Sequence, residues 1–211
     1  MPTTIYLVRH GQSIGNLHRL YLGHTDLDLS ELGFTQAEQT ANHLSEVNFS
    51  KIYSSDLKRA YNTAIPHAKL RGLTINSSEN LRELFLGEWE NMPVDDLINS
   101  QKELFVDGWL ENFGTFSIPG GEVVWEGGLR FAREVERIAK ENEGKTVLIT
   151  SHAAVIRAFW GIISCIEKEN LAKEIKFPTN ASYSVVEYKD GKLIPLKYSC
   201  DEHLTNITKV E

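Results

Sequence analysis

The chain has 211 residues, of which 41% are hydrophobic and 24% are charged. These values are ordinary for a globular protein and exclude a disordered, collagen-like or coiled-coil chain. Its 22 basic and 29 acidic side chains give a formal net charge of −7, so we expect no nucleic-acid partner. The length predicts a single domain over residues 1–211, built on one core with room for an insertion.

The cysteines and the apolar segments indicate where the protein acts. Cys165 and Cys200 are too few for a disulfide framework or a four-thiolate zinc site, so we expect free thiols in a reducing compartment. The segment before Arg9 lacks the basic stretch of a secretory signal, and no apolar run approaches the roughly 18 residues that span a bilayer. We therefore expect a cytoplasmic protein that does not contact a membrane.

Predicted strands and helices alternate along most of the chain. Short apolar runs predict buried strands at residues 5–8, 52–53 and 147–150. Apolar residues at helical spacing predict helices over residues 32–44, 56–70, 129–141 and 153–163. The pair Asp190-Gly191 predicts a tight turn between antiparallel strands over residues 184–188 and 193–198. This pattern predicts an α/β fold in which helices flank a mostly parallel central sheet, with a C-terminal antiparallel hairpin.

The helix over residues 56–70 and the segment over residues 88–128 have features of their own. Ser54 and Ser55 are available to cap the helix, and Asp56 in its first turn suits the helix dipole. The later segment interrupts the alternation and contains three of the four tryptophans, so we expect a helical, cap-like insertion there. Ligands of such sheets bind beyond the carboxyl ends of the strands, and we expect the insertion to cover that site.

Histidines and arginines gather at the predicted carboxyl edge. His10 follows the first strand and His152 follows the strand over residues 147–150, so both are expected at one edge. The seven histidines show no close pair at metal-ligand spacing, and we expect no metal site. Arg9 precedes His10 and Arg59 lies near a helix start, which points to an anion, because guanidinium groups match phosphate oxygens. Taken singly, each of these residues would more often be an ordinary polar or surface residue.

Several motifs follow one another at consistent spacing. They are Leu7-Val8-Arg9-His10-Gly11-Gln12-Ser13 with Asn16, Gly23-His24-Thr25-Asp26 with Leu29-Ser30-Glu31-Leu32-Gly33, Ser54-Ser55-Asp56-Leu57-Lys58-Arg59-Ala60 with Thr63-Ala64, Leu81-Arg82-Glu83 with Gly87 and Trp89-Glu90, Pro119-Gly120-Gly121-Glu122, and Ser151-His152. In this order they resemble the signature of the histidine phosphatase superfamily, the phosphoglycerate mutase-like proteins. The resemblance extends over nearly the whole chain.

The resemblance implies a metal-independent phosphomonoester phosphatase that needs no cofactor and acts on a small phosphorylated metabolite. His10 would be the nucleophile, and Arg9, Arg59 and His152 would bind the phosphoryl oxygens. Nucleophilic attack requires a neutral imidazole, and a backbone acceptor for its other N–H would set the tautomer. Further substrate contacts are implied for Gly11, Gln12, Ser13, Asn16, Leu22, Gly23 and Ala153.

Glu83 would be the proton donor in this resemblance. It has to be protonated when the leaving alkoxide departs and then act as a base on water. The apolar residues Phe85, Leu86 and Trp89 are candidates for its surroundings. The alternative is an ordinary loop carboxylate in an ion pair with Arg82.

Two departures from the family pattern bear on activity. Ala153 stands where the family commonly has glycine, although its backbone N–H remains. The segment Glu83-Leu84-Phe85-Leu86-Gly87-Glu88-Trp89-Glu90 differs from the Glu-Arg-His-Tyr-Gly of cofactor-dependent phosphoglycerate mutases. It resembles the phosphatase branch, which includes broad-specificity phosphatases and alpha-ribazole phosphate phosphatases.

Alternatives stay open beside the phosphatase. One is a phosphoglycerate mutase-type phosphotransferase, and another is a non-catalytic module that binds a phosphorylated ligand. Dimerisation is common among such enzymes, so a homodimer is considered, although no feature of the sequence decides it. Aromatic side chains of the insertion would either stack on an apolar part of the substrate or pack the cap itself: Phe105, Trp109, Phe113, Phe116 and Trp125.

Overall fold

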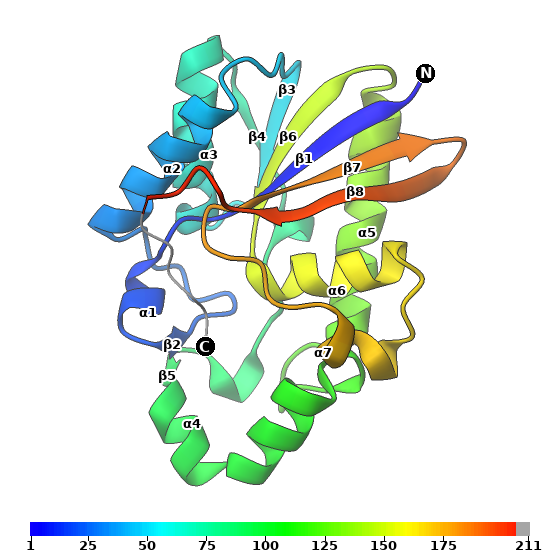
Figure 1. Ribbon diagram of the computed structural model, residues 1–211. Coiled ribbons are helices and arrows are strands. Elements are labelled where there is room, and N and C mark those ends of the chain that lie inside the picture. Colours follow the sequence, from blue (N-terminus) through cyan, green and yellow to red (C-terminus); the bar gives the residue numbers. More distant parts are fainter. Residues whose placement is uncertain (206–211) are drawn as a thin grey trace.

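A six-stranded sheet with the order β4-β3-β6-β1-β7-β8 runs through the centre of the computed structural model, which describes residues 1–205 (Figure 1). Its strands are β1 (Thr3–Arg9), β3 (Lys51–Ser54), β4 (Ile75–Ser77), β6 (Thr146–Ser151), β7 (Tyr183–Lys189) and β8 (Lys192–Cys200). The first four in the sheet order are parallel, whereas β7 and β8 are antiparallel to their neighbours. The predicted α/β fold, with a mostly parallel sheet and a C-terminal hairpin, is confirmed.

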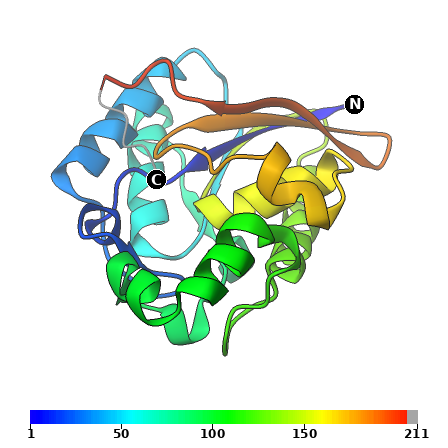
Figure 2. The ribbon, with the colours of Figure 1, turned by 60° about the horizontal axis from the view of Figure 1, so that its bottom comes forward.

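Two pairs of helices cover the two faces of this sheet. They are α2 (Glu31–His43) with α3 (Lys58–Arg71) on one face, and α5 (Val124–Glu141) with α6 (Ala153–Ile163) on the other (Figures 1 and 2). Successive side chains of a strand point to opposite faces, so Ile5 and Leu7 join the core under α5 and α6, and Val8 joins the core under α3. None of the helices within residues 1–205 is long and apolar enough to cross a membrane.

Shorter elements connect these layers. They are α1 (Ile14–Leu17), β2 (Leu20–Tyr21), η1 (Glu79–Leu81), η2 (Gly87–Trp89), β5 (Met92–Pro93), α4 (Val94–Ser100), the π-helix η3 (Leu104–Glu111), η4 (Phe113–Thr115), η5 (Lys168–Asn170) and α7 (Leu171–Glu174). The strands β2 and β5 pair in a small antiparallel sheet. In Figure 1, α1 and α4 lie below the central sheet, on the side where β1 ends, and Figure 2 brings the helices after β5 to the front.

The start of α3 differs from the sequence prediction. The helix begins at Lys58 after an N-cap, Leu57, that has no side-chain cap hydrogen bond. Ser54 Oγ donates to the Ser55 carbonyl oxygen, and Asp56 binds the guanidinium of Arg82. The predicted roles of Ser54 and Ser55 as caps and of Asp56 in the first turn are therefore wrong, because these polar groups have nearer partners outside the helix.

The start of α5 also differs. The helix begins at Val124, whereas its apolar spacing predicted a start at residue 129. Gly127 and Gly128 lie inside this helix, although glycine is unfavourable inside helices. A Cβ atom on Gly128 would lie 2.8 Å from the Cβ of Ala158, so a glycine at this position lets α5 and α6 approach closely.

Candidate active site

A cavity of about 330 Å³ lies at the carboxyl ends of β1 and β6. These strands are parallel neighbours with Arg9 opposite Ser151, and this register brings together the two histidines that follow them. The imidazole rings of His10 and His152 have their centroids 5.2 Å apart and meet edge to face. The predicted meeting of both histidines at one sheet edge is therefore present in the structure.

The ring of His10 is buried and held by a backbone acceptor. Its Nδ1 lies 2.7 Å from the carbonyl oxygen of Gly11. Because a carbonyl oxygen only accepts hydrogen bonds, this contact assigns the proton to Nδ1 and leaves the lone pair on Nε2. Burial, followed by the positive charges of Arg59 and Arg9, holds the pKa of His10 well below the usual imidazole value. His10 is therefore neutral at neutral pH, as a nucleophile must be.

His152 is the N-cap residue of α6 and is fully buried. Neither of its ring nitrogens has a hydrogen-bond partner within residues 1–205. Burial, with the charges of Arg59 and His10 next in importance, also holds the pKa of His152 well below the usual value. A buried polar group without a partner is unfavourable, so a ligand atom that hydrogen-bonds to this ring would remove that cost.

Two buried guanidinium groups line the same cavity. Arg9 donates from Nη1 to the Pro178 carbonyl oxygen at 2.6 Å, and within the described chain its Nε has no partner. Arg59 donates to the carbonyl oxygens of Thr25 at 2.8 Å and Gly23 at 2.7 Å. Burial lowers the pKa of each arginine to about 10, which leaves both charged at neutral pH. Two buried positive charges at one cavity form an anion site.

The carboxylate of Glu83 lies at the N-terminus of α6 and lines the cavity. Its Oε1 accepts hydrogen bonds from the backbone N–H groups of Leu84 at 3.0 Å and Val155 at 2.8 Å, and its Oε2 accepts from Ala154 at 3.0 Å. Backbone N–H groups at a helix N-terminus favour a negative charge. The start of α6 thus holds this carboxylate in the cavity that His10 also lines.

The alternative considered for this glutamate, an ion pair with Arg82, is not formed, because Arg82 binds Asp56 through two nitrogens. The role of Glu83 as proton donor stays a prediction. The three apolar residues predicted around Glu83 are divided among the cavity, the core and the surface: Leu86, Trp89 and Phe85, respectively.

The loop after β1 is arranged around Asn16. The Oδ1 atom of Asn16 accepts hydrogen bonds from the N–H and Oγ of Ser13, both at 3.0 Å, and from Asn180 Nδ2 at 3.2 Å. All three residues line the cavity. Asn180, which was not among the predicted site residues, also donates to the His10 carbonyl oxygen at 3.1 Å. It precedes β7, and the only signal for its position would have been that this strand pairs with β1.

The other loop residues predicted to contact substrate fall into two groups. Three of them line the cavity: Leu22, Gly23 and Ala153. Gly11 and Gln12 instead attach the loop to α3 and α2. The Gly11 N–H donates a hydrogen bond to Thr63 Oγ1 at 3.1 Å, and the Gln12 N–H donates to Gln36 Oε1 at 2.8 Å. A Cβ on Gly11 would lie 2.4 Å from the Gly33 carbonyl oxygen, so these backbones touch. Gly11 and Gln12 are not among the residues that line the cavity, and their substrate contacts stay a prediction.

The outer wall of the cavity is apolar. Its side chains come from β2 and the residue after it, from the segment before η2, from α4 and η3, and from the segment before β7. They are Leu20, Tyr21, Leu22, Leu86, Val94, Phe105, Trp109, Leu110 and Phe177. The ring of Trp109 lies 5.4 Å from that of Tyr21, edge to face, and stacks on Phe177 at 5.9 Å. Of the other aromatic residues named for the insertion, Phe113 and Phe116 belong to the hydrophobic core and Trp125 packs against it.

Metal ligands do not gather at this site in the part of the chain described. Within residues 1–205, no group of three or more His, Cys, Asp or Glu side chains is arranged to hold a metal ion.

Several known proteins resemble this chain over nearly its whole length. The family model described as the histidine phosphatase superfamily (branch 1) matches residues 5–201. Phosphoserine phosphatase 1 of Hydrogenobacter thermophilus is 32% identical over 201 residues, which cover 95% of this chain and 93% of the relative. The structure of Bacillus stearothermophilus YhfR has a TM-score of 0.89 and 27% identity, over 95% of this chain and 98% of that one. The mycobacterial glucosyl-3-phosphoglycerate phosphatase has a TM-score of 0.87 and 25% identity, over 94% and 99%.

Proposed function

Since the chain belongs to the histidine phosphatase superfamily and is a phosphoric monoester hydrolase, we propose that it releases phosphate through a phosphohistidine at His10. One observation carries the proposal. A buried, neutral His10 shares its cavity with the cations Arg9 and Arg59 and with the carboxylate of Glu83. The two arginines supply positive charge, and neutral His152 supplies a ring hydrogen bond to the phosphoryl group, so the mechanism requires no divalent metal.

In the first step the phosphoryl group passes to the protein. The Nε2 lone pair of His10 attacks the phosphorus atom, and a P–N bond forms as the P–O bond to the leaving group breaks. The electrons of the broken bond stay on the leaving oxygen, which takes the proton of the Glu83 carboxyl group. The alcohol then departs, while Arg9, Arg59 and His152 stabilise the charge on the phosphoryl oxygens.

In the second step water releases the phosphoryl group. The carboxylate of Glu83 takes a proton from a water molecule as the water oxygen attacks phosphorus. The P–N bond breaks and its electrons return to Nε2, which restores neutral His10 and protonated Glu83 and yields inorganic phosphate. Between the two steps, the N–H groups of Ala154 and Val155 hold the ionised carboxylate.

The apolar wall supports a proposal for the substrate and for the segment over residues 88–128. This segment contributes Val94, Phe105, Trp109 and Leu110 to the cavity. We therefore treat residues 1–211 as one catalytic domain in which residues 88–128 form a cap. Aromatic and aliphatic walls favour phosphomonoesters whose alcohol part is apolar or aromatic.

We place the enzyme in the cytoplasm. Cys165 and Cys200 are free thiols, Cys165 being exposed, and this suits a reducing compartment. A homodimer stays a prediction, which the molar mass in solution would test.

The test of the proposed function is phosphate release in the presence of a chelator. The substrates are p-nitrophenyl phosphate, phosphoserine, 3-phosphoglycerate and alpha-ribazole phosphate. We expect the wild type to release phosphate with chelator present, fastest from the aromatic ester. His10→Ala should lower the rate by at least about 1,000-fold because it removes the nucleophile. The matched control is His18→Ala, which removes an exposed histidine of the neighbouring loop and should leave the rate unchanged.

Other outcomes would identify the alternatives. Release that stops with chelator, or that continues in His10→Ala, would contradict the phosphohistidine mechanism. Transfer of the phosphoryl group to a second hydroxyl would indicate a mutase-type phosphotransferase. Phosphate binding without turnover would indicate a binding module.

A further inference from the structure

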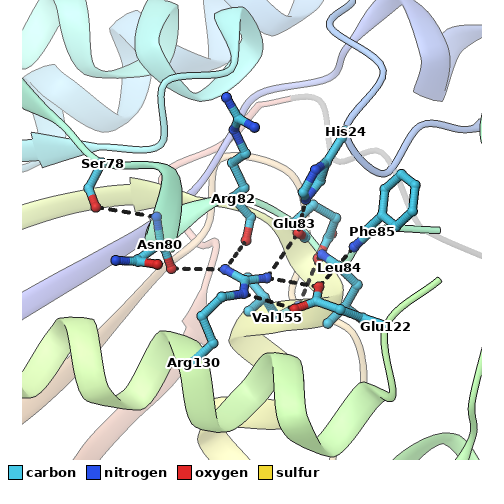
Figure 3. A network of polar contacts seen from close by, with 10 residues as sticks. All are labelled: His24, Ser78, Asn80, Arg82, Glu83, Leu84, Phe85, Glu122, Arg130 and Val155. Atoms are coloured by element: carbon cyan, nitrogen blue, oxygen red, sulfur yellow. Dashed lines mark hydrogen bonds and ion pairs between the residues drawn. The ribbon is translucent and has the colours of Figure 1, made fainter. Parts of the chain in front are cut away.

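The Pro119-Gly120-Gly121-Glu122 motif has no part in the mechanism above, yet its glutamate contacts the segment that carries Glu83. Figure 3 shows Glu122 beside Arg130, which extends from α5 toward the backbone before Glu83. Arg130 binds the Glu122 carboxylate through Nε at 2.9 Å and Nη2 at 3.0 Å. The same carboxylate accepts the Phe85 N–H at 2.9 Å, and the Glu122 N–H donates to the Phe85 carbonyl oxygen at 2.8 Å.

The remaining N–H groups of Arg130 bind three carbonyl oxygens of the segment over residues 80–83. Nη1 donates to the carbonyl oxygens of Asn80 at 2.9 Å and Arg82 at 3.2 Å, and Nη2 donates to that of Glu83 at 3.1 Å (Figure 3). Every N–H group of the guanidinium therefore has an acceptor. A flexible ammonium cannot reproduce this set of directed contacts.

These contacts hold a stretch of irregular backbone. Residues 82–83 follow η1 and lie outside helices and strands, so their carbonyl oxygens need partners from elsewhere. Side chains supply them: the Leu81 carbonyl oxygen accepts from Ser151 Oγ at 2.7 Å, and that of Glu83 also lies 3.0 Å from His24 Nε2. Glu83 is thus held at its carbonyl oxygen on one side and at its carboxylate, by α6, on the other.

We propose that Arg130 and Glu122 are positioning residues for the proton donor Glu83, because they hold the backbone from which its carboxyl group reaches the leaving oxygen. This inference rests on the proposed function, which makes Glu83 the acid. The pair is ionised at neutral pH: burial disfavours the Glu122 charge, but the hydrogen bond and charge of Arg130 outweigh it and lower the pKa of Glu122.

The test compares substrates that differ in their need for a proton. An alkyl phosphate leaves as a strongly basic alkoxide and needs the acid, whereas p-nitrophenyl phosphate leaves as a weakly basic phenolate. For Arg130→Lys, we expect kcat/KM to fall about 100-fold with the alkyl phosphate, because a misplaced acid cannot reach the leaving oxygen. With p-nitrophenyl phosphate the fall should be less than about 5-fold. The inhibition constant of inorganic phosphate should stay unchanged, since Arg9 and Arg59 are untouched.

Two further variants separate positioning from general stability. Arg137→Lys is the matched control, because Arg137 on the same helix binds Glu134 with two nitrogens, at 2.9 and 2.8 Å. Its effect should be the same for both substrates. In a Glu83→Gln background, Arg130→Lys should cause little additional loss with the alkyl phosphate, because the two residues act through one proton transfer.

The possible results decide the proposal. A selective loss with the alkyl phosphate that disappears in the Glu83→Gln background would support it. Equal losses with both substrates, or losses that multiply in the double variant, would overturn it, since Arg130 would then only stabilise the fold. A wild type that releases no phosphate from either ester would overturn the proposed function and this role with it.

Discussion

At the residue scale, the arginines that line the cavity also help to keep His10 unprotonated. Arg59 lowers the pKa of both His10 and His152, although burial is the larger cause for each ring. The Nδ1 contact of His10 with the Gly11 carbonyl oxygen then selects the tautomer. A neutral imidazole with its lone pair on Nε2 follows from burial, the neighbouring positive charges and this backbone contact.

We predict that the ring of His10 titrates well below the usual imidazole pKa of about 6.5 in the folded chain, because burial and the charges of Arg59 and Arg9 disfavour its protonated form. The measurement is the pH dependence of its ring-proton NMR signal, assigned by its disappearance in His10→Ala. In urea, where the chain is unfolded, histidine signals should titrate near about pH 6.5. A midpoint above about pH 6 in the folded chain would contradict the prediction.

At the element scale, the segment over residues 85–88 contacts the segment over residues 119–122 through backbone atoms. The Glu88 N–H donates to the Pro119 carbonyl oxygen at 3.0 Å. Gly87 has a φ of +52°, and a Cβ there would lie 2.3 Å from the same oxygen. A Cβ on Gly121 would lie 2.4 Å from the Phe85 carbonyl oxygen. These glycines therefore permit the contact that brings Glu122 to the segment of the proton donor.

A pair of glycine substitutions tests this packing. Gly72, the C-cap of α3, also has a positive φ of +62°, but a Cβ there meets nothing within 4 Å. Gly72→Ala should destabilise the chain by about 1 kcal/mol through backbone conformation alone. Gly87→Ala should cost roughly 3 kcal/mol or more, because the opposing backbone must move. Urea unfolding measures both, and equal losses would show that the two loops are not tightly packed.

At the scale of the whole molecule, neutral histidines are buried on more than one face of the sheet. His67 on α3 is fully buried in the layer opposite α5 and α6, and within residues 1–205 neither of its ring nitrogens has a partner. Burial, with smaller contributions from Arg71 and His203, lowers the pKa of His67 to about 3. Folding therefore excludes a proton that the unfolded chain would bind below about pH 6.5.

Neutral His67 makes the free energy of unfolding fall as the pH falls. The stability contributed by neutral His67 is fully present above about pH 6.5 and is lost as the pH falls toward about 3, at roughly 1.4 kcal/mol per pH unit. His67→Leu should therefore reduce the acid slope of the free energy of unfolding by about one proton. Urea unfolding at several pH values measures this slope. An unchanged slope in His67→Leu would show that this ring does not exclude a proton in the folded state.

Local patterns in the sequence were enough to predict the alternation of strands and helices and the meeting of His10 with His152, whereas the roles of Glu83 and the loop residues came from the family resemblance. Strands and helices can be recognised from the spacing of apolar residues within a short stretch of sequence. His10 and His152 directly follow their strands. Parallel neighbours end at one edge, so the meeting of these residues followed from the topology. The boundaries of α6, Ala153–Ile163, agree with the predicted range because its apolar spacing is uninterrupted.

What only the tertiary structure decided is the choice of partners between distant segments. Asn180 reaches His10 because β7 pairs with β1, and Arg130 reaches Glu83 because α5 crosses the loop before it. Asp56 binds Arg82 instead of starting a helix. In each case several partners were available to a polar group, and the selection depends on burial and geometry across the fold. Such competition leaves no local signature, since a hydrogen bond is decided by which groups the packed core brings within reach.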